Sequence, residues 1–165
     1  MNAAVRRADH LMQLSDILAP QRVLAGAHAS SKKRALELLS QLLAEQADTT
    51  PQEIFASLTA RERLGSTALG YGVALPHGRL RKLTATRGAF VQLVQGVDFD
   101  AADRGPVDLM FAIVVPELCT DEHLQLVAQI AELFSNEAIR NHLRQAKDTD
   151  ALLQALTHWN PQRAP

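Results

Sequence analysis

The chain has 165 residues, of which 47% are hydrophobic and 21% charged, and its formal net charge at pH 7 is −1. It is long enough to fold as one domain, and its balanced charge gives no strong field that would recruit nucleic acid or an anionic membrane. Cys119 is the only cysteine, which excludes an intrachain disulfide and a zinc–thiolate site. The longest apolar run, residues 109–116, is far short of the roughly 20 residues of a membrane span, and no apolar signal segment follows Arg6 and Arg7. We therefore expect a cytoplasmic protein without membrane insertion and without a nucleic-acid partner.

The N-terminal part of the chain predicts little regular structure before a first strand. Residues 1–13 show no clear hydrophobic period and are expected to be frayed. Residues 14–18 suit a short helical turn, which Pro20 ends. Residues 21–29 alternate loosely between apolar and polar side chains, which predicts a partly exposed strand.

Two helices are predicted next. Apolar side chains spaced by three, four and seven positions indicate a helix that Ser30 or Ser31 caps and that runs to about residue 47. The basic cluster at its start, residues 32–34, is expected to be a solvated face. The second helix is predicted to end near Leu64. Its start carries a cap, a proline for the first helical position and the acidic half of a capping box: Thr50, Pro51 and Glu53.

The C-terminal half predicts two strands and three helices. Residues 87–95 and 107–116 are rich in Val, Leu, Ile and Phe, as buried strands are. Thr120 is predicted to cap the first helix, and the others lie near residues 137–146 and 150–159. This order indicates an α/β fold: a single domain whose central mixed β-sheet is flanked by helices on both faces. The side chains of the first helix that are expected to face the core are Leu124, Val127, Ala128, Ala131 and Phe134.

One histidine follows a predicted strand end, in the sequence GVALPHGR at residues 72–79. Pro76 cannot donate a ladder hydrogen bond, so the strand is predicted to stop there and His77 to emerge at the edge of the sheet. Gly72 and Gly78 lack side chains, which would let a large partner approach the imidazole. A neutral imidazole is a nucleophile, so His77 is a candidate for a reaction with another protein's reactive group; the alternative is a structural loop histidine.

A second histidine, His123, is predicted at the third position of the helix that Thr120 caps. The positive end of the helix dipole favours an anion there and lowers the pKa of an imidazole, which keeps it neutral. The other histidines are expected to be exposed surface groups: His10, His28, His142 and His158.

Metal and nucleotide sites find little support in the sequence. Two histidines without the HExxH spacing are a weak metal signal, and Glu62 and Glu122 are interpreted as carboxylates of helix surfaces. Residues 65–72 lack the ending of a phosphate-binding P-loop, and the dinucleotide fingerprint is absent. We therefore expect neither a metal nor a cofactor.

Several segments together resemble the enzyme IIA family of the bacterial phosphoenolpyruvate-dependent phosphotransferase system, of the fructose/mannitol type. The resemblance covers residues 14–156, and we expect the domain to span residues 14–159, followed by a tail over 160–165. Residues 31–37 (SKKRALE) and 99–101 (FDA) are typical of its nitrogen-regulatory branch. The segments that carry the family resemblance are Arg61, GST at 65–67, GVALPHG at 72–78, VDLMFAIVVP at 107–116 and His123-Leu124.

The resemblance implies a phosphocarrier. It implies that His77 accepts a phosphoryl group on Nε2 from an HPr-like phosphocarrier protein, and that Arg61 and His123 flank the phosphate. It also implies regulated partners such as potassium-transport or sensor-kinase components. The chain departs from the family pattern at residues 68–71 (ALGY), which affects the rim of the pocket rather than the nucleophile.

Two other functions stay open at this point. A sugar-specific enzyme IIA would pass the phosphate to a IIB component, although the SKKR motif at residues 31–34 favours the regulatory branch. A binding module with an unreactive His77 is the alternative from a different class.

Overall fold

The computed structural model describes residues 12–44, 49–118 and 120–158. The predictions for residues 1–11, for the tail, for His10 and for Cys119 therefore lie outside the described residues. None of the helices in the described ranges is long and apolar enough to cross a membrane.

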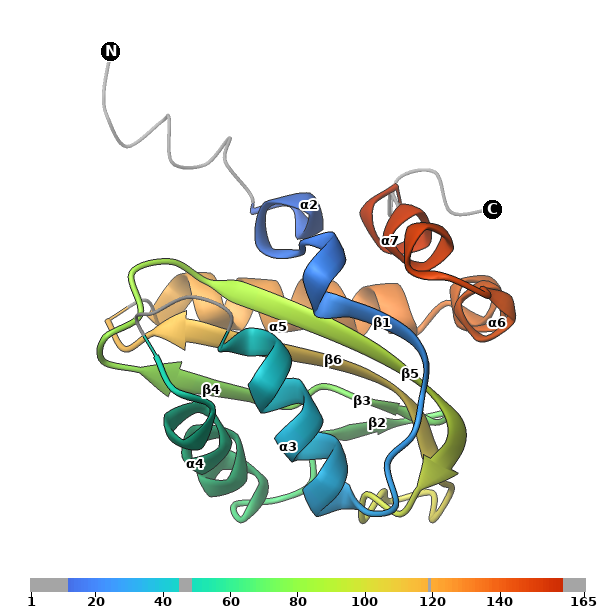
Figure 1. Ribbon diagram of the computed structural model, residues 1–165, viewed down its shortest axis with the longest axis horizontal. Coiled ribbons are helices and arrows are strands. Elements are labelled where there is room, and N and C mark those ends of the chain that lie inside the picture. The colour runs from blue at the N-terminus through green and yellow to red at the C-terminus, as the bar shows by residue number, and fades with distance from the viewer. Residues whose placement is uncertain (1–11, 45–48, 119, 159–165) are drawn as a thin grey trace.

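The centre of the fold is a six-stranded mixed sheet (Figure 1). Strand β6 lies between β5, which is antiparallel to it, and β3 and β4, which both pair with its other edge in parallel. The strand order is β1 (Val23–Ala27), β5 (Arg87–Val97), β6 (Val107–Pro116), β3 (Val73–Ala74) and β2 (Ala68–Gly70), with β4 (His77–Leu80) beside β6 as well.

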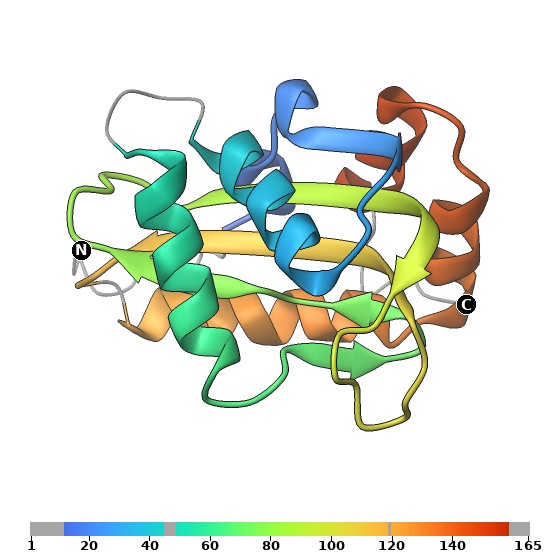
Figure 2. The ribbon, with the colours of Figure 1, turned by 60° about the horizontal axis from the view of Figure 1, so that its bottom comes forward.

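Helices cover both faces of the sheet, as the sequence predicted (Figures 1 and 2). On one face lie α3 (Lys32–Leu43) and α4 (Pro51–Glu62), side by side. The other face carries α2 (Leu14–Ile17), α5 (Thr120–Phe134), α6 (Glu137–Gln145) and α7 (Thr149–Thr157), and a short 3₁₀ turn, η1 (Pro20–Arg22), precedes β1.

The alternation of side chains along β6 produces two cores. Met110 and Val114 pack against the face with α3 and α4, whereas Phe111 and Ile113 pack against the opposite face. All four are fully buried, because helices cover both faces of the strand.

Two of the predicted helix starts are confirmed by their caps. Ser31 accepts a hydrogen bond from Arg34 N and begins α3, and Thr50 accepts one from Glu53 N and begins α4. Helix α3 ends at Leu43, earlier than predicted. Helix α5 begins at Thr120 itself.

The predicted inward face of α5 was correct only in part, since Phe134 is buried and Val127 packs against the same core. Leu124 is 65% exposed and Ala128 is also exposed, whereas Leu126, Ile130 and Leu133 are buried. Apolar residues occupy more than one face of this helix, so their spacing alone could not select the face that meets the sheet.

Candidate functional site

A break in the edge of the sheet creates the site around His77. Strand β3 ends at Ala74, and Leu75 N donates to Thr67 O at 3.0 Å. Pro76 has no N–H, but its carbonyl accepts from Ile113 N at 3.0 Å. The predicted strand end before Pro76 is thus confirmed. His77, however, is the first residue of a further strand, β4, rather than a loop residue beyond the sheet.

The alternation of β4 turns His77 toward α5. Gly78 faces Ser57 of α4, and Leu80 belongs to the core under α3 and α4. His77 and Arg79 therefore lie on the opposite face of the strand. The ring of His77 lies there 5.1 Å from the ring of His123, centroid to centroid, at 60°.

The protonation of His77 follows from one backbone contact. Its Nδ1 lies 2.8 Å from Leu75 O, and since a carbonyl only accepts, Nδ1 carries the hydrogen. The lone pair is then on Nε2. Burial lowers the pKa of His77 from 6.5, the bond to Leu75 O raises it, and the positive charge of Arg61 lowers it. The ring is consequently neutral at pH 7 and nucleophilic at Nε2.

His123 is the fourth residue of α5, and it is only 6% exposed. Its pKa is lowered from 6.5 to about 4, first by burial and then by the charges of His77, Arg79 and Arg61. The pKa is lowered, as predicted, but the causes are burial and the neighbouring charges rather than the start of the helix. Within the described ranges, Nδ1 of His123 is buried and has no hydrogen-bond partner. A buried ring nitrogen in this state is suited to an oxygen brought in by a ligand.

Arg61 lies in the last turn of α4, as predicted. Its Nη1 donates to Gly65 O at 2.8 Å, which holds the guanidinium at the end of the helix. Its charge lowers the pKa of both His77 and His123. The structure thus brings the rings of His77 and His123 together, and the charge of Arg61 acts on both.

A fourth residue, Arg79, was missed as a site residue. It is exposed, and its charge lowers the pKa of His77 and of His123. The available signal was its place two positions after His77, which puts it on the same face of a strand.

Comparisons with known proteins identify the family of this chain. Residues 16–159 match the model of the family described as "Phosphoenolpyruvate-dependent sugar phosphotransferase system, EIIA 2". The chain belongs to this EIIA 2 family.

Its relatives place it in the nitrogen-regulatory branch. It is 44% identical over 145 residues to the nitrogen regulatory protein of Pseudomonas aeruginosa, covering 87% of this chain and 94% of that protein. It is 41% identical over 150 residues to the Escherichia coli protein of the same name, covering 90% and 92%. The crystal structure of nitrogen regulatory protein IIA-Ntr from Neisseria meningitidis superimposes with a TM-score of 0.84 at 38% identity, covering 87% of this chain and 99% of that one.

Three exposed leucines of this EIIA domain lie near site residues in the chain, and we refer to them together as the apolar rim: Leu64, Leu118 and Leu124. They are 84%, 95% and 65% exposed. Leu64 N donates to Arg61 O, Leu124 follows His123, and Leu118 lies between β6 and α5. Each of them exposes a large apolar side chain close in the chain to a residue of the site.

The role predicted for the glycines beside His77 was wrong. A Cβ on Gly78 would collide with Ser57 Oγ and lie 3.1 Å from Ser57 Cβ. A Cβ on Gly72, whose φ is +78°, would lie 2.8 Å from Asp108 Oδ1. Both glycines permit close packing inside the protein and leave no added space for a partner.

Two charged residues were also misjudged. Glu62 is only 8% exposed, so it is not a surface carboxylate. Lys32 pairs with it at 3.0 Å and is not simply solvated, whereas Lys33 and Arg34 are exposed as predicted.

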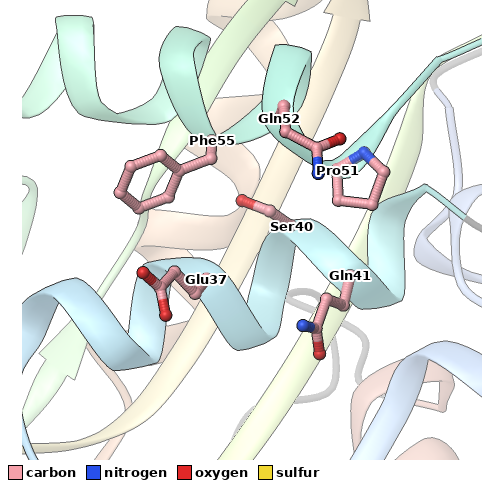
Figure 3. Close-up of a pocket in the computed structure, with 6 residues that line it drawn as sticks. All are labelled: Glu37, Ser40, Gln41, Pro51, Gln52 and Phe55. Carbon is pink, nitrogen blue, oxygen red and sulfur yellow. The ribbon is translucent and has the colours of Figure 1, made fainter.

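The remaining candidates stay outside the site. His28, His142 and His158 are exposed, as predicted. Across the described ranges, no group of three or more His, Cys, Asp or Glu residues is arranged to hold a metal ion. A cavity of about 290 Å³ opens between α3 and α4 (Figure 3), but neither His77, Arg61 nor His123 lines it.

Proposed function

We propose that this EIIA protein is a phosphocarrier that accepts a phosphoryl group on Nε2 of His77 from an HPr-like phosphocarrier protein. The observation that carries the proposal is the bond from Nδ1 to Leu75 O, because it leaves the lone pair on Nε2 at a half-buried ring. Family membership supports the same chemistry.

The transfer is a substitution at phosphorus. The lone pair of Nε2 forms the new N–P bond while the N–P bond of the donor's phosphohistidine breaks, and its electron pair returns to the donor ring. The hydrogen on Nδ1 stays in place. The positive charge that the His77 ring gains is stabilised by Leu75 O, 2.8 Å away.

Arg61 and His123 assist the transfer in this proposal. The planar guanidinium of Arg61 pairs with phosphoryl oxygens and spreads their charge. His123 donates from its unpartnered ring nitrogen, which removes the cost of leaving that buried atom without a hydrogen bond. No metal or nucleotide takes part, because the donor already carries an activated phosphoryl group.

The apolar rim formed by Leu64, Leu118 and Leu124 is proposed to receive the donor protein. We place the exchange in the cytoplasm, where phosphoenolpyruvate supplies the phosphoryl group. Its purpose is regulatory: the phosphorylation state of His77 controls binding to target proteins, such as potassium-transport or sensor-kinase components. The similarity to nitrogen regulatory proteins supports this role over a sugar-specific one, since a relative described as a fructose-specific EIIA component is 27% identical.

The test is phosphorylation from phosphoenolpyruvate by enzyme I and an HPr-like carrier. One acid-labile phosphate per chain is expected on the wild type and none on His77→Ala. His142→Ala is the matched control, since this histidine is exposed and lies on α6. Equal labelling of His77→Ala and wild type would refute the proposal, and so would a wild-type chain that takes no phosphate.

Arg61→Ala should be labelled more slowly while keeping a normal unfolding transition. Arg34→Ala, which removes an exposed arginine of α3, should be labelled at the wild-type rate. An unchanged rate in Arg61→Ala would remove this residue from the mechanism.

A further inference from the structure

A partly buried ion pair connects the start of α3 with the end of α4. Lys32 Nζ, at the start of α3, lies 3.0 Å from Glu62 Oε2 and 3.2 Å from Asp100 Oδ2. The Glu62 side chain is only 4% exposed. Burying a carboxylate costs free energy because the charge loses its hydration. The groups that bond to Glu62 therefore indicate its structural role.

The second set of partners is the backbone that enters β2. Both carboxylate oxygens of Glu62 accept from Thr67 N at 3.3 Å, and Oε1 also accepts from the Thr67 hydroxyl in a short bond. Thr67 is itself 5% exposed. Glu62 therefore fixes the position of Thr67 through two donors at once, and charge-assisted bonds of this kind are the stronger ones.

From Thr67 the contacts lead to the nucleophile. Thr67 O accepts from Leu75 N at 3.0 Å, and Leu75 O holds Nδ1 of His77 at 2.8 Å.

The backbone of Glu62, without its carboxylate, also contacts the residue that holds Arg61. Gly65 N donates to Glu62 O at 3.1 Å, and Gly65 O accepts from Arg61 Nη1 at 2.8 Å. The side chain of Glu62 is thus connected to His77 through Thr67 and Leu75. Its backbone is connected to Arg61 through Gly65.

The geometry points to Glu62 as a positioning residue for phosphoryl transfer, with Lys32 holding its carboxylate in place. Through Thr67 and Leu75 it sets the hydrogen on Nδ1 of His77, which leaves Nε2 free to attack. This role rests on the proposed function of His77, but its first consequence, the tautomer of the free histidine, does not depend on it.

The experiment compares Glu62→Gln with the wild type. A glutamine has one acceptor oxygen, so it cannot serve both Thr67 donors and Lys32. In ¹⁵N NMR spectra of the unphosphorylated protein, the His77 ring should show the Nδ1–H form in the wild type and a mixture of tautomers in the variant. The kcat for transfer from the HPr-like donor should fall by about tenfold or more, because small misplacements of reacting groups have effects of this size. KM should not change, because the apolar rim is intact.

Two further variants separate positioning from stability. Thr67→Val removes the hydroxyl donor and keeps the shape, and it should change the tautomer and kcat in the same direction by a smaller factor. Leu39→Val weakens the fully buried core under α3, about two helical turns after Lys32, and it should lower stability while tautomer and kcat stay at wild-type values. An equal fall of kcat in Leu39→Val would show a merely structural role and overturn the inference.

The two proposals fail in different ways. If wild type is labelled on His77 and Glu62→Gln keeps both its tautomer and its kcat, positioning by Glu62 is refuted and the phosphocarrier function stands. If wild type is not labelled but its tautomer shifts in Glu62→Gln, the function is refuted and the structural connection stands.

Discussion

Replacement of Gly78 by alanine tests how closely α4 approaches the strand that carries His77. The new Cβ would collide with Ser57 Oγ and lie 3.1 Å from Ser57 Cβ and 3.2 Å from the Ser57 backbone carbon. Ser57 Oγ cannot simply turn away without cost, since it donates to Arg79 O at 2.9 Å. Helix α4 must therefore shift away from β4.

The magnitude follows from two opposing effects. Overpacking of this kind costs about 1–3 kcal/mol, while the loss of glycine's freedom in the unfolded chain stabilises by about 0.4–1 kcal/mol. The net expectation is a loss of about 1–2 kcal/mol in the free energy of unfolding. For a domain of this size each kcal/mol lowers Tm by about 2–4 °C, so the variant should melt roughly 2–8 °C lower.

Thermal and urea unfolding, followed by circular dichroism, measure the effect. Ser57→Gly removes both side-chain atoms that the new Cβ meets, so the double variant should recover about 1 kcal/mol relative to the sum of the single changes. If Gly78 instead kept space for a partner protein, Gly78→Ala would be as stable as wild type or more so, and only transfer from the donor would slow. That result would refute the packing argument.

Three further predictions concern acid stability, a surface contact and the rim. The folded-state pKa of His123, lowered to about 4, lies below the value of 6.5 for the free side chain, so the folded protein binds fewer protons between these values and loses stability as the pH falls through them. The free energy of unfolding lost through His123 approaches about 3 kcal/mol at pH 4. Urea titrations at several pH values should show that His123→Phe loses less free energy of unfolding than the wild type as the pH falls. Parallel pH dependences of the two proteins would contradict this prediction. Arg144 forms a bidentate pair with Asp108 at 3.0 Å, so Arg144→Gln should lower the free energy of unfolding by about 1 kcal/mol, checked in urea, with no change telling against it. Leu118→Glu and Leu124→Glu should each raise KM for an HPr-like donor by about tenfold with normal unfolding, and unchanged kinetics would exclude the rim as the docking surface.

The strands and helices that carry strong local signals were predictable. Ser31 and Thr50 cap helices where the sequence indicated, and β5 and β6 follow from their apolar runs. The short strands β2 and β4 were not predicted. Both are short, and each forms only by pairing with another strand. Strand β2 pairs with β3 across a tight turn, and β4 pairs with β6, which is distant in the chain.

In the site, too, local features were predictable and features that depend on distant contacts were not. The place of His77 after a strand end was predicted from Pro76, since proline's missing N–H acts locally. Glu62 was misjudged because burial of a carboxylate depends on Lys32, which lies 30 positions earlier in the chain. Arg79 was missed because its relation to His77 requires that the chain resume as a strand.

The sequence by itself determined the fold class and the strand break at Pro76, and it singled out His77 as the candidate nucleophile, since periodicity, caps and proline act between neighbouring residues. Only the tertiary structure decided which face of α5 meets the sheet, that Gly78 packs against α4, and which nitrogen of His77 carries the hydrogen. These depend on contacts between segments distant in the chain or on the path of the backbone around Leu75, and the order of residues does not specify such distances.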